Sequence, residues 1–279
     1  MIERLDTAEF LPPKEDIGYV DIRSFHPLYE KMAFRANIIH VGPKGVGKSM
    51  AVYAYAAKNR IPIVTFDCSE DVRRPHLIGH YVLRGTETPF ILGPVTTAFE
   101  IANEAGKCIL NFEEINALTP QTQKILNPAT DFRAKVEVPE ARKVFKLNPN
   151  AKLWVTGSMN TSVYSGVYAL NEDLKSRMRL IDVPYPSPQE EFLILKRQVS
   201  FAGDLTERVM KSLCSLATET RQKDALEYAL STRDLVQIAE DVVALGLQDG
   251  FRVAMGKFEG QDKATAKARM ESAIPNLKL

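Results

Sequence analysis

The sequence predicts an α/β fold built on a parallel five-stranded sheet, followed by a smaller domain made only of helices. Along the first two thirds of the chain, short apolar segments alternate with stretches whose apolar residues have helical spacing. After Val183 only stretches with helical spacing follow. Strands that alternate with helices favour a parallel sheet with helices on both faces. The segments with the length and composition of buried strands are 37–41, 61–66, 107–112, 153–156 and 180–183.

The first strand and helix follow a charged leading segment over residues 1–35. The run Asn37–Val41 is apolar and stops at Gly42, as a buried strand does. The next segment, 49–58, is rich in alanine, the residue with the highest helix propensity, and it predicts a helix. Further helices are expected over 94–105 and 119–127, on the way to the third and fourth strands.

The composition changes at residues 185–188, where the sequence reads Tyr-Pro-Ser-Pro. We therefore expect a domain boundary near 185, with an α/β nucleotide-binding domain over 1–185 and a helical lid domain over 186–279. The leucine and alanine stripes of the lid have helical spacing and indicate core packing. The helices expected there are 190–199, 206–218 and 232–245.

The charge balance and composition are those of an ordinary globular protein. The 279 residues include 36 Lys and Arg against 35 Asp and Glu, so no bulk charge favours nucleic acid or anionic lipid. No stretch approaches 18 uninterrupted apolar residues, and the charged start lacks a secretory signal pattern, so we expect neither a membrane span nor secretion. Three cysteines without a CxxC pair fit a reducing cytoplasm. His76 and His80 have helical spacing but no third ligand nearby, so we expect no metal there.

The strongest functional signal is the motif G-x-x-x-x-G-K-[ST], which starts at Gly42 and ends at Lys48 and Ser49. Its glycines let successive backbone N–H groups curl around phosphates, and the following helix adds its positive dipole end. Lys48 would reach the β- and γ-phosphates and the Ser49 hydroxyl would ligate Mg²⁺, so the expected cofactors are ATP and Mg²⁺. The alternative is a glycine turn with a surface lysine. The residues expected to hold the nucleotide are Gly42, Pro43, Lys44, Gly45, Val46, Gly47, Lys48, Ser49 and Met50.

Two adjacent carboxylates, Glu113 and Glu114, end the apolar run that begins at Cys108. Ligands of open α/β sheets bind at the carboxyl ends of the strands, where these side chains would lie. We expect Glu113 to share the Mg²⁺ with Ser49, and Glu114 to polarise the attacking water. A solvated acidic pair at the start of a loop is the alternative.

Residues 113–116, Glu-Glu-Ile-Asn at the end of a strand, resemble the D-E-I-N signature of MoxR-type AAA+ ATPases, which include the CbbQ/NorQ branch. The resemblance extends over nearly the whole chain. Residues 77–79 and 90–94 are similar to the family's L-I-G … G-P stretch, a hairpin inserted in the second helix. Residues 136–150 are similar to the family's insertion before the fourth core strand.

Two further segments of the resemblance imply catalytic roles. Residues 156–160 fall where the family carries its sensor-1 asparagine, which implies that Asn160 orients the attacking water. The segment 170–178 resembles the one that holds the arginine finger, which implies that Arg177 of a neighbouring subunit completes the site, with Arg179 as the fallback. The alternatives are a turn cap for Asn160 and a cover for a helix C-terminus for the two arginines.

Residues 231–233 resemble the sensor-2 motif of the helical lid, which implies that Arg233 contacts phosphate. A cation at the start of a helix is electrostatically disfavoured, and this supports a role for Arg233 facing an anion. A surface salt bridge is the alternative.

The sequence departs from the family at Glu113, where the family has aspartate. The extra methylene moves the carboxylate by roughly an ångström or more toward the metal, so slow hydrolysis is one expected consequence. Asn111 is also unusual, because a polar residue inside a central strand needs a hydrogen-bond partner. In this family the inserted hairpin faces the ring's pore or its partner, so Tyr81, Leu83 and Phe90 are expected to be exposed.

The resemblance implies a ring-forming ATPase, with six subunits expected, that acts as a chaperone-like remodeler of a protein client. A von Willebrand factor A domain protein is the partner that the family implies. A motor acting on nucleic acid is the alternative, because related members of the clade couple hydrolysis to DNA translocation, but the near-neutral charge disfavours it. A metabolite kinase with the same loop would not need Arg177 and Arg233 together with the inserts.

Overall fold

The computed structural model describes residues 5–13, 17–161, 167–200, 202–222 and 226–279. The contacts between residues divide the chain into two compact units. Unit 1 consists of Met1–Glu15, Ser24–Gly42 and Lys48–Val183. Unit 2 consists of Asp16–Arg23, Pro43–Gly47 and Pro184–Leu279, so two short segments from the first fifth of the sequence are grouped with the C-terminal helices. The division at 183 lies close to the composition change at 185, but the sequence gives no sign of those two segments.

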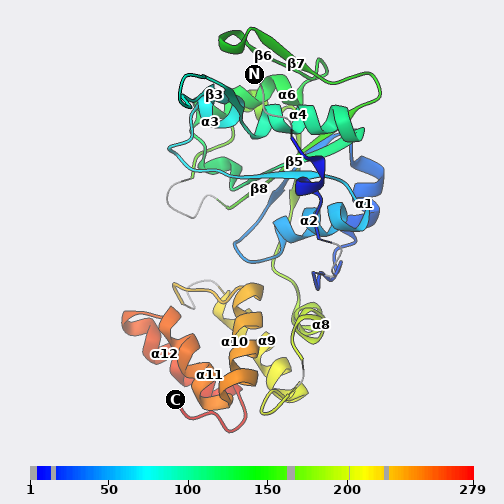
Figure 1. Cartoon of the computed structure of the whole chain (residues 1–279). Helices are drawn as coiled ribbons and strands as arrows, with labels where there is room; N and C mark the ends of the chain where they lie inside the picture. Colours follow the sequence, from blue (N-terminus) through cyan, green and yellow to red (C-terminus); the bar gives the residue numbers. More distant parts are fainter. Residues whose placement is uncertain (1–4, 14–16, 162–166, 201, 223–225) are drawn as a thin grey trace. The chain divides into compact units, whose positions relative to one another are not determined.

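Unit 1 contains the five-stranded parallel sheet that the sequence predicts, in the order β2-β5-β8-β1-β9. Figure 1 labels β5 and β8 of this sheet. Each predicted strand is present, with ends that differ from the prediction by a few residues. Strand β1 lies between β8 and β9, so the loop that follows β1 starts beside the carboxyl end of the central strand β8. The strands are β1 (Asn37–Val41), β2 (Ile63–Asp67), β5 (Lys107–Glu113), β8 (Lys152–Met159) and β9 (Met178–Asp182).

Helices cover both faces of this sheet. Neighbouring residues of one strand point to opposite faces, and two such neighbours on β8 contact different helices. Val155 packs in the cluster that holds Phe99 of α4 (Pro94–Ala105). Its neighbour Trp154 instead lies against Tyr29 and Tyr55, with ring centroids 5.3 and 5.8 Å away. These tyrosines belong to α1 (Phe25–Met32) and α2 (Lys48–Lys58).

Helix α4 forms over the residues that the sequence predicts, and its ends explain why. Pro94 occupies the first turn, where a missing N–H costs nothing, and Gly106 ends the helix with a φ of 79°. The prediction of a single helix over 119–127 is wrong. The structure has three short turns instead, α5 (Pro120–Gln123), a 3₁₀ turn over Lys124–Leu126 and α6 (Asn127–Thr130). Pro128 cannot donate a backbone hydrogen bond and its ring crowds the preceding turn, which interrupts the helix.

Two antiparallel hairpins interrupt unit 1 where the family resemblance places its insertions. The first pairs β3 (Gly79–Tyr81) with β4 (Phe90–Leu92) and lies between α3 (Arg74–Ile78) and α4. The second pairs β6 (Lys135–Val138) with β7 (Lys143–Lys146) ahead of β8, and Figure 1 shows it projecting away from the sheet. The short helix α7 (Glu172–Lys175) then leads to β9.

The exposure expected for the first hairpin is right for two of its three side chains. Tyr81 and Leu83 are 47% and 74% exposed, but Phe90 is buried at 4%. The expectation for Phe90 is wrong because its ring lies over Gly79, where an added Cβ would come within 2.7 Å of it. The hairpin is therefore anchored by Phe90 and presents the other two side chains.

Unit 2 has a separate apolar core made by five helices. Leu213 of α9, Leu235 of α10 and Phe251 of α11 are fully buried in it. The helices are α8 (Pro188–Gln198), α9 (Glu207–Thr220), α10 (Thr232–Leu245), α11 (Leu247–Ala254) and α12 (Gly260–Ala273). As the sequence predicts, no strand follows β9 in the described part of the chain. A search of the described residues finds no helix that is long and apolar enough to span a membrane.

Candidate nucleotide-binding site

The phosphate loop leaves the end of β1 and leads into α2, the strand–loop–helix context that the motif needs. Gly42 is packed so closely that an added Cβ would lie 2.1 Å from the carbonyl oxygen of Val183. Gly45 and Gly47 have φ values of 72° and 87°, in the left-handed region that side chains disfavour. The glycines of the motif are therefore required by the backbone path. The remaining residues expected to hold the nucleotide, Pro43, Lys44, Val46 and Met50, lie along the same path.

Lys48 and Asn160 are brought together at the carboxyl edge of the sheet. Because β1 and β8 run parallel, with Val41 opposite Met159, the residues that follow the two strands are neighbours. Lys48 is 7% exposed, and its ammonium donates to the carbonyl of Gly42 at 2.8 Å and to Asn160 Oδ1 at 3.2 Å. This arrangement fixes a cation beside an amide in a buried position.

Ser49 and Glu113, the expected magnesium ligands, also meet. The Ser49 hydroxyl donates to Glu113 Oε2, which accepts a second hydrogen bond from the Ser158 hydroxyl at 2.7 Å. Hydroxyl and carboxylate oxygens are the hard ligands that Mg²⁺ prefers. The position of Glu113 is therefore compatible with a metal held from the phosphate loop.

Asn111 has the partners that its position in a central strand requires. Its side-chain N–H donates to Glu113 Oε1 at 2.6 Å, and its Oδ1 accepts from Thr156 Oγ1 at 2.8 Å. Thr156 and Ser158 stand two residues apart on β8, so both face Asn111 and Glu113 on the neighbouring strand. Ser158 is a residue of this site for which the sequence predicted no role. The signal for it was the alternating polar row inside an otherwise apolar strand.

Glu114 lies directly after β5 in an unusual backbone conformation. Its φ and ψ are 51° and 47°, in the left-handed region, and such a conformation costs a non-glycine residue about 1 kcal/mol or more. Its backbone N–H donates to Ser158 Oγ at 3.2 Å. This hydrogen bond ties the turn after β5 to β8, next to the residues that hold Glu113.

The side-chain nitrogen of Asn160 is the feature that fits a bound phosphate or water. It is buried, and among the described residues it has no hydrogen-bond acceptor. Asn116 donates to the backbone carbonyl of Asn160 at 3.1 Å and so holds this residue in place. A buried amide donor next to an ammonium group fits an anion or the water that attacks it. Together with the Ser49–Glu113 oxygens, this donor set fits ATP with Mg²⁺.

The structure does not bring the arginines of unit 1 to this cluster. The Arg177 guanidinium follows α7 and donates to the backbone carbonyl of Asp173, and Arg179 is exposed on β9. Arg233 belongs to unit 2, where its backbone N–H donates to the carbonyl of Gly45 at 3.2 Å.

Burial sets the ionisation of two groups beside the site. Burial, with the Lys48 ammonium as a further cause, lowers the pKa of His40 to about 4, so the imidazole is neutral at physiological pH. Burial also raises the pKa of the Cys68 thiol, and the carboxylates of Glu113 and Asp67 add to the effect. Cys68 is therefore protonated and unsuited to act as a nucleophile.

Comparison with known proteins identifies the family of this chain. A family model described as "AAA domain (dynein-related subfamily)" matches residues 37–178, which is half of the chain. Protein CbbQ of Hydrogenophilus thermoluteolus is 28% identical over 218 residues, which cover 77% of this chain and 76% of that protein. An uncharacterized protein of Staphylococcus saprophyticus is 27% identical over 249 residues, covering 87% and 92% of the two chains.

A solved structure agrees on the fold. The crystal structure of NtrX from Brucella abortus superimposes with a TM-score of 0.53 at 17% identity and covers 81% of this chain. This chain corresponds to 51% of that chain's length. The chain described here belongs to the dynein-related AAA family and is a phosphate-loop AAA+ ATPase of the MoxR type.

Proposed function

We propose that this AAA+ ATPase hydrolyses ATP with Mg²⁺ in a ring of identical subunits and uses the energy to remodel a protein client. The observation that carries the proposal is the convergence of Lys48, Ser49, Glu113 and Asn160 at the carboxyl edge of β1, β5 and β8. Phosphoryl transfer depends mainly on positioning and on charge stabilisation, and these four side chains supply both.

In the proposed mechanism, Lys48 holds the β- and γ-phosphates and Ser49 and Glu113 hold the metal. Mg²⁺, when bound, offsets the charge of the phosphate oxygens. Asn160 orients a water, and Glu114 accepts a proton from it as the water oxygen bonds to the γ-phosphorus. The bond from that phosphorus to the bridging oxygen breaks, and ADP and phosphate leave. Arg177 of a neighbouring subunit stabilises the transition state.

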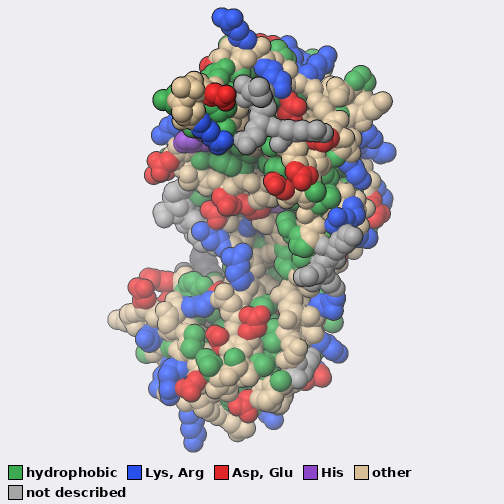
Figure 2. All heavy atoms as spheres, viewed as in Figure 1, with side chains coloured by type: hydrophobic (Ala, Val, Ile, Leu, Met, Phe, Trp, Pro, Cys, Tyr) green, Lys and Arg blue, Asp and Glu red, His purple; other side chains and the backbone are tan. Residues whose placement is uncertain are grey.

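A protein client is favoured over nucleic acid because the chain is nearly neutral. Figure 2 shows Lys and Arg side chains interspersed with Asp and Glu on the face in view, as the balance of 36 against 35 suggests. Nucleic-acid motors depend on cationic surfaces, and their affinity falls steeply with salt. DNA or RNA that stimulated hydrolysis in a salt-sensitive manner would overturn this part of the proposal. A von Willebrand factor A domain protein is the first partner to test by co-purification.

Two substitutions test the ATPase proposal. Glu114→Gln removes the proton acceptor but keeps the size of the side chain, so hydrolysis should slow by about a hundredfold or more while ATP still binds. Lys48→Ala should instead weaken ATP binding itself, because it removes the buried cation. Steady-state hydrolysis and equilibrium binding of ATP measure the two effects.

Matched controls are available on exposed positions. Glu240→Gln and Lys152→Ala change the same residue types at exposed positions in α10 and β8, and both variants should behave as the parent. Unchanged turnover in the Glu114→Gln protein would remove Glu114 as the base. ATP binding by Lys48→Ala at the parent's affinity would overturn the nucleotide site.

A further inference from the structure

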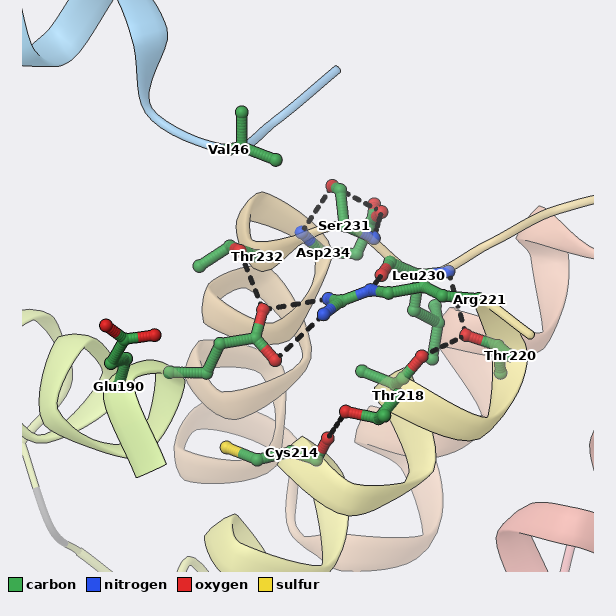
Figure 3. A network of polar contacts seen from close by, with 12 residues as sticks. Val46, Glu190, Cys214, Thr218, Thr220, Arg221, Leu230, Ser231, Thr232 and Asp234 are labelled. Carbon is green, nitrogen blue, oxygen red and sulfur yellow. Dashed lines mark hydrogen bonds and ion pairs between the residues drawn. The ribbon is translucent and has the colours of Figure 1, made fainter. Parts of the chain in front are cut away.

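A buried ion pair in unit 2 is not used by the mechanism above. Glu191 of α8 is fully buried, and the side chain of Arg221, at the end of α9, is 8% exposed. The guanidinium donates to both carboxylate oxygens, at 2.8 and 3.1 Å, and its Nε donates to the carbonyl of Leu230 at 2.7 Å. Figure 3 shows Arg221 at the centre of this network, between helices α8, α9 and α10.

The same network includes the first residue of α10. The Thr232 hydroxyl donates to Glu191 Oε1 at 2.7 Å and is buried with it (Figure 3). The carboxylate of Glu191 therefore receives three hydrogen bonds. On the two sides of Ser231, Leu230 is bonded to Arg221 and Thr232 to Glu191. A buried ion pair often adds little stability compared with apolar residues of the same volume, so its contribution is better sought in the geometry that it fixes.

A second set of contacts fixes the residue on the other side of Arg233. Asp234 is 4% exposed and accepts hydrogen bonds from the Ser231 backbone N–H at 2.8 Å and from the Ser231 hydroxyl at 2.7 Å. Lys257 and Tyr228 also contact its carboxylate. The hydrogen bonds of Thr232 and of Asp234 thus hold the backbone on both sides of Arg233.

Arg233 itself differs from its two neighbours. Its side chain is exposed and, among the described residues, forms no hydrogen bond or ion pair. Its backbone N–H is held by the carbonyl of Gly45 at 3.2 Å, and Gly45 is packed so closely that an added Cβ would lie 2.4 Å from Ser231 Oγ. The backbone of Arg233 is therefore fixed against the Pro43–Gly47 segment of unit 2, while its guanidinium remains available for a ligand.

We propose that Glu191, Arg221 and Thr232 are positioning residues that hold Arg233 where it contacts the phosphates of ATP. This inference rests on the proposed ATPase function and adds to it three residues that do not touch the nucleotide. Thr232 connects the buried ion pair to Arg233, because its hydroxyl is hydrogen-bonded to Glu191 and it precedes Arg233 in the chain.

Thr232→Val is the substitution that tests this, because it keeps the shape of the side chain and removes only the hydroxyl. Glu191→Gln and Arg221→Met are less suitable, since each leaves the other residue as a buried charge with no opposite charge to neutralise it, and this can prevent folding. We expect Thr232→Val to weaken ATP binding by about threefold to tenfold and Arg233→Ala by about tenfold or more, the range for hydrogen bonds to charged groups. Thr232→Ser, which restores the hydroxyl, should bind ATP as the parent does.

The double variant Thr232→Val/Arg233→Ala separates positioning from general loosening of the fold. If Thr232 acts through Arg233, the double variant should bind ATP no more weakly than Arg233→Ala alone. Effects that multiply, or a Thr232→Ser protein as weak as Thr232→Val, would overturn the inference. Unchanged ATP affinity in Arg233→Ala would also overturn it, while a loss in Lys48→Ala would leave the ATPase proposal standing. Thermal unfolding of each variant confirms that it is folded.

Discussion

Glu113 is the residue at which this chain departs from the aspartate of the MoxR-type signature, and the structure provides a reason for the difference. Its carboxylate contacts Ser49 directly, and Asn111 donates to its other oxygen at 2.6 Å. Asn111 and Glu113 stand two residues apart on one strand, so they face the same side of the sheet. The longer acid and the unusual asparagine are therefore two parts of one arrangement.

Glu113→Asp should lower activity, although it restores the residue that the family signature carries. The shorter side chain would withdraw the carboxylate by roughly 1.5 Å, beyond hydrogen-bonding distance of Ser49 and Asn111. We expect the Mg²⁺ concentration for half-maximal hydrolysis to rise by about tenfold, measured by titration with Mg²⁺ at saturating ATP.

Glu113→Gln is the matched control for this prediction. It keeps the length of the side chain and removes the charge, so it separates the effect of reach from the effect of the negative charge. Faster hydrolysis by the aspartate variant at the same Mg²⁺ concentration would contradict the prediction. It would show that Glu113 lowers the rate of hydrolysis and that its hydrogen bond to Asn111 does not raise it.

At the scale of elements, helix α1 is attached to strand β1 through one buried hydrogen bond. The Tyr29 hydroxyl and His40 Nε2 are 2.6 Å apart, and both side chains are fully buried. Since burial lowers the pKa of His40 to about 4 from 6.5, this strand carries a neutral imidazole in the folded protein. Protonation of that imidazole opposes the packed state.

The free energy of unfolding should therefore fall as the pH drops from 6.5 to about 4, because the unfolded chain binds a proton over this interval and the folded protein does not. The loss from this histidine is at most about 3 kcal/mol. Below pH 4 both states are protonated, and this contribution to the pH dependence ends. Urea unfolding at a series of pH values measures it.

His40→Gln serves as the comparison for the pH series, since glutamine can still hydrogen-bond to Tyr29 but does not titrate. The difference in free energy of unfolding between parent and variant should shrink with acid over that interval. A difference that stays constant from pH 7 to pH 4 would show that His40 takes up its proton at the same pH in the folded and unfolded states, which would contradict the lowered pKa.

Most elements could be predicted from the sequence, and the failures have local causes. Periodicity located the five strands and the helices α2, α4, α8, α9 and α10 because these elements bury long apolar faces. It failed over 119–127, because Pro128, just past that stretch, lies in the first turn of a separate helix, α6, and cannot donate a hydrogen bond to the turn before it. It also could not show that Phe90 packs on Gly79, since that contact depends on the twist of the hairpin.

The candidate site was predicted in part for the same kind of reason. Lys48, Ser49, Glu113 and Asn160 follow three parallel strands, so a correct sheet order brings their side chains to one edge. Ser158 was given no role although it alternates with Thr156 on β8. Asn116 was matched only as part of the signature at 113–116, because its hydrogen bond to the Asn160 carbonyl leaves no pattern in the sequence. The roles of Glu114, Arg177 and Arg233 remain predictions.

At the scale of the whole molecule, the proposed ring supplies what one subunit lacks. Arg177 is half-exposed at the end of α7, and its guanidinium contacts a backbone carbonyl four residues earlier. A finger that acts in a neighbouring subunit requires a head-to-tail interface, the kind that closes into rings.

Mixing two inactive variants tests this arrangement. Rings of Arg177→Ala subunits and rings of Glu114→Gln subunits should each be nearly inactive, because an arginine finger contributes about a thousandfold or more. In mixed rings, an Arg177→Ala subunit next to a Glu114→Gln subunit forms a site with both groups intact. Random mixing should restore hydrolysis at about one site in four, measured as phosphate release after dissociation and reassembly.

The control for the mixing experiment is Arg179→Ala, mixed in the same way. Restored activity with Arg179→Ala and not with Arg177→Ala would move the finger to β9. If neither mixture recovers activity, while Arg177→Ala rings alone are inactive, the arginine acts within its own subunit.

The chain contains a single tryptophan, and the packing of Trp154 against Tyr29 and Tyr55 gives it an optical use. Its indole is fully buried in the sheet of unit 1, and its Nε1–H donates to the carbonyl of Ala36. Indole emission therefore reports on the sheet alone, whereas circular dichroism is dominated by helices and includes the whole of unit 2. Following both signals through one denaturant titration distinguishes cooperative melting of the chain from loss of one unit while the other persists.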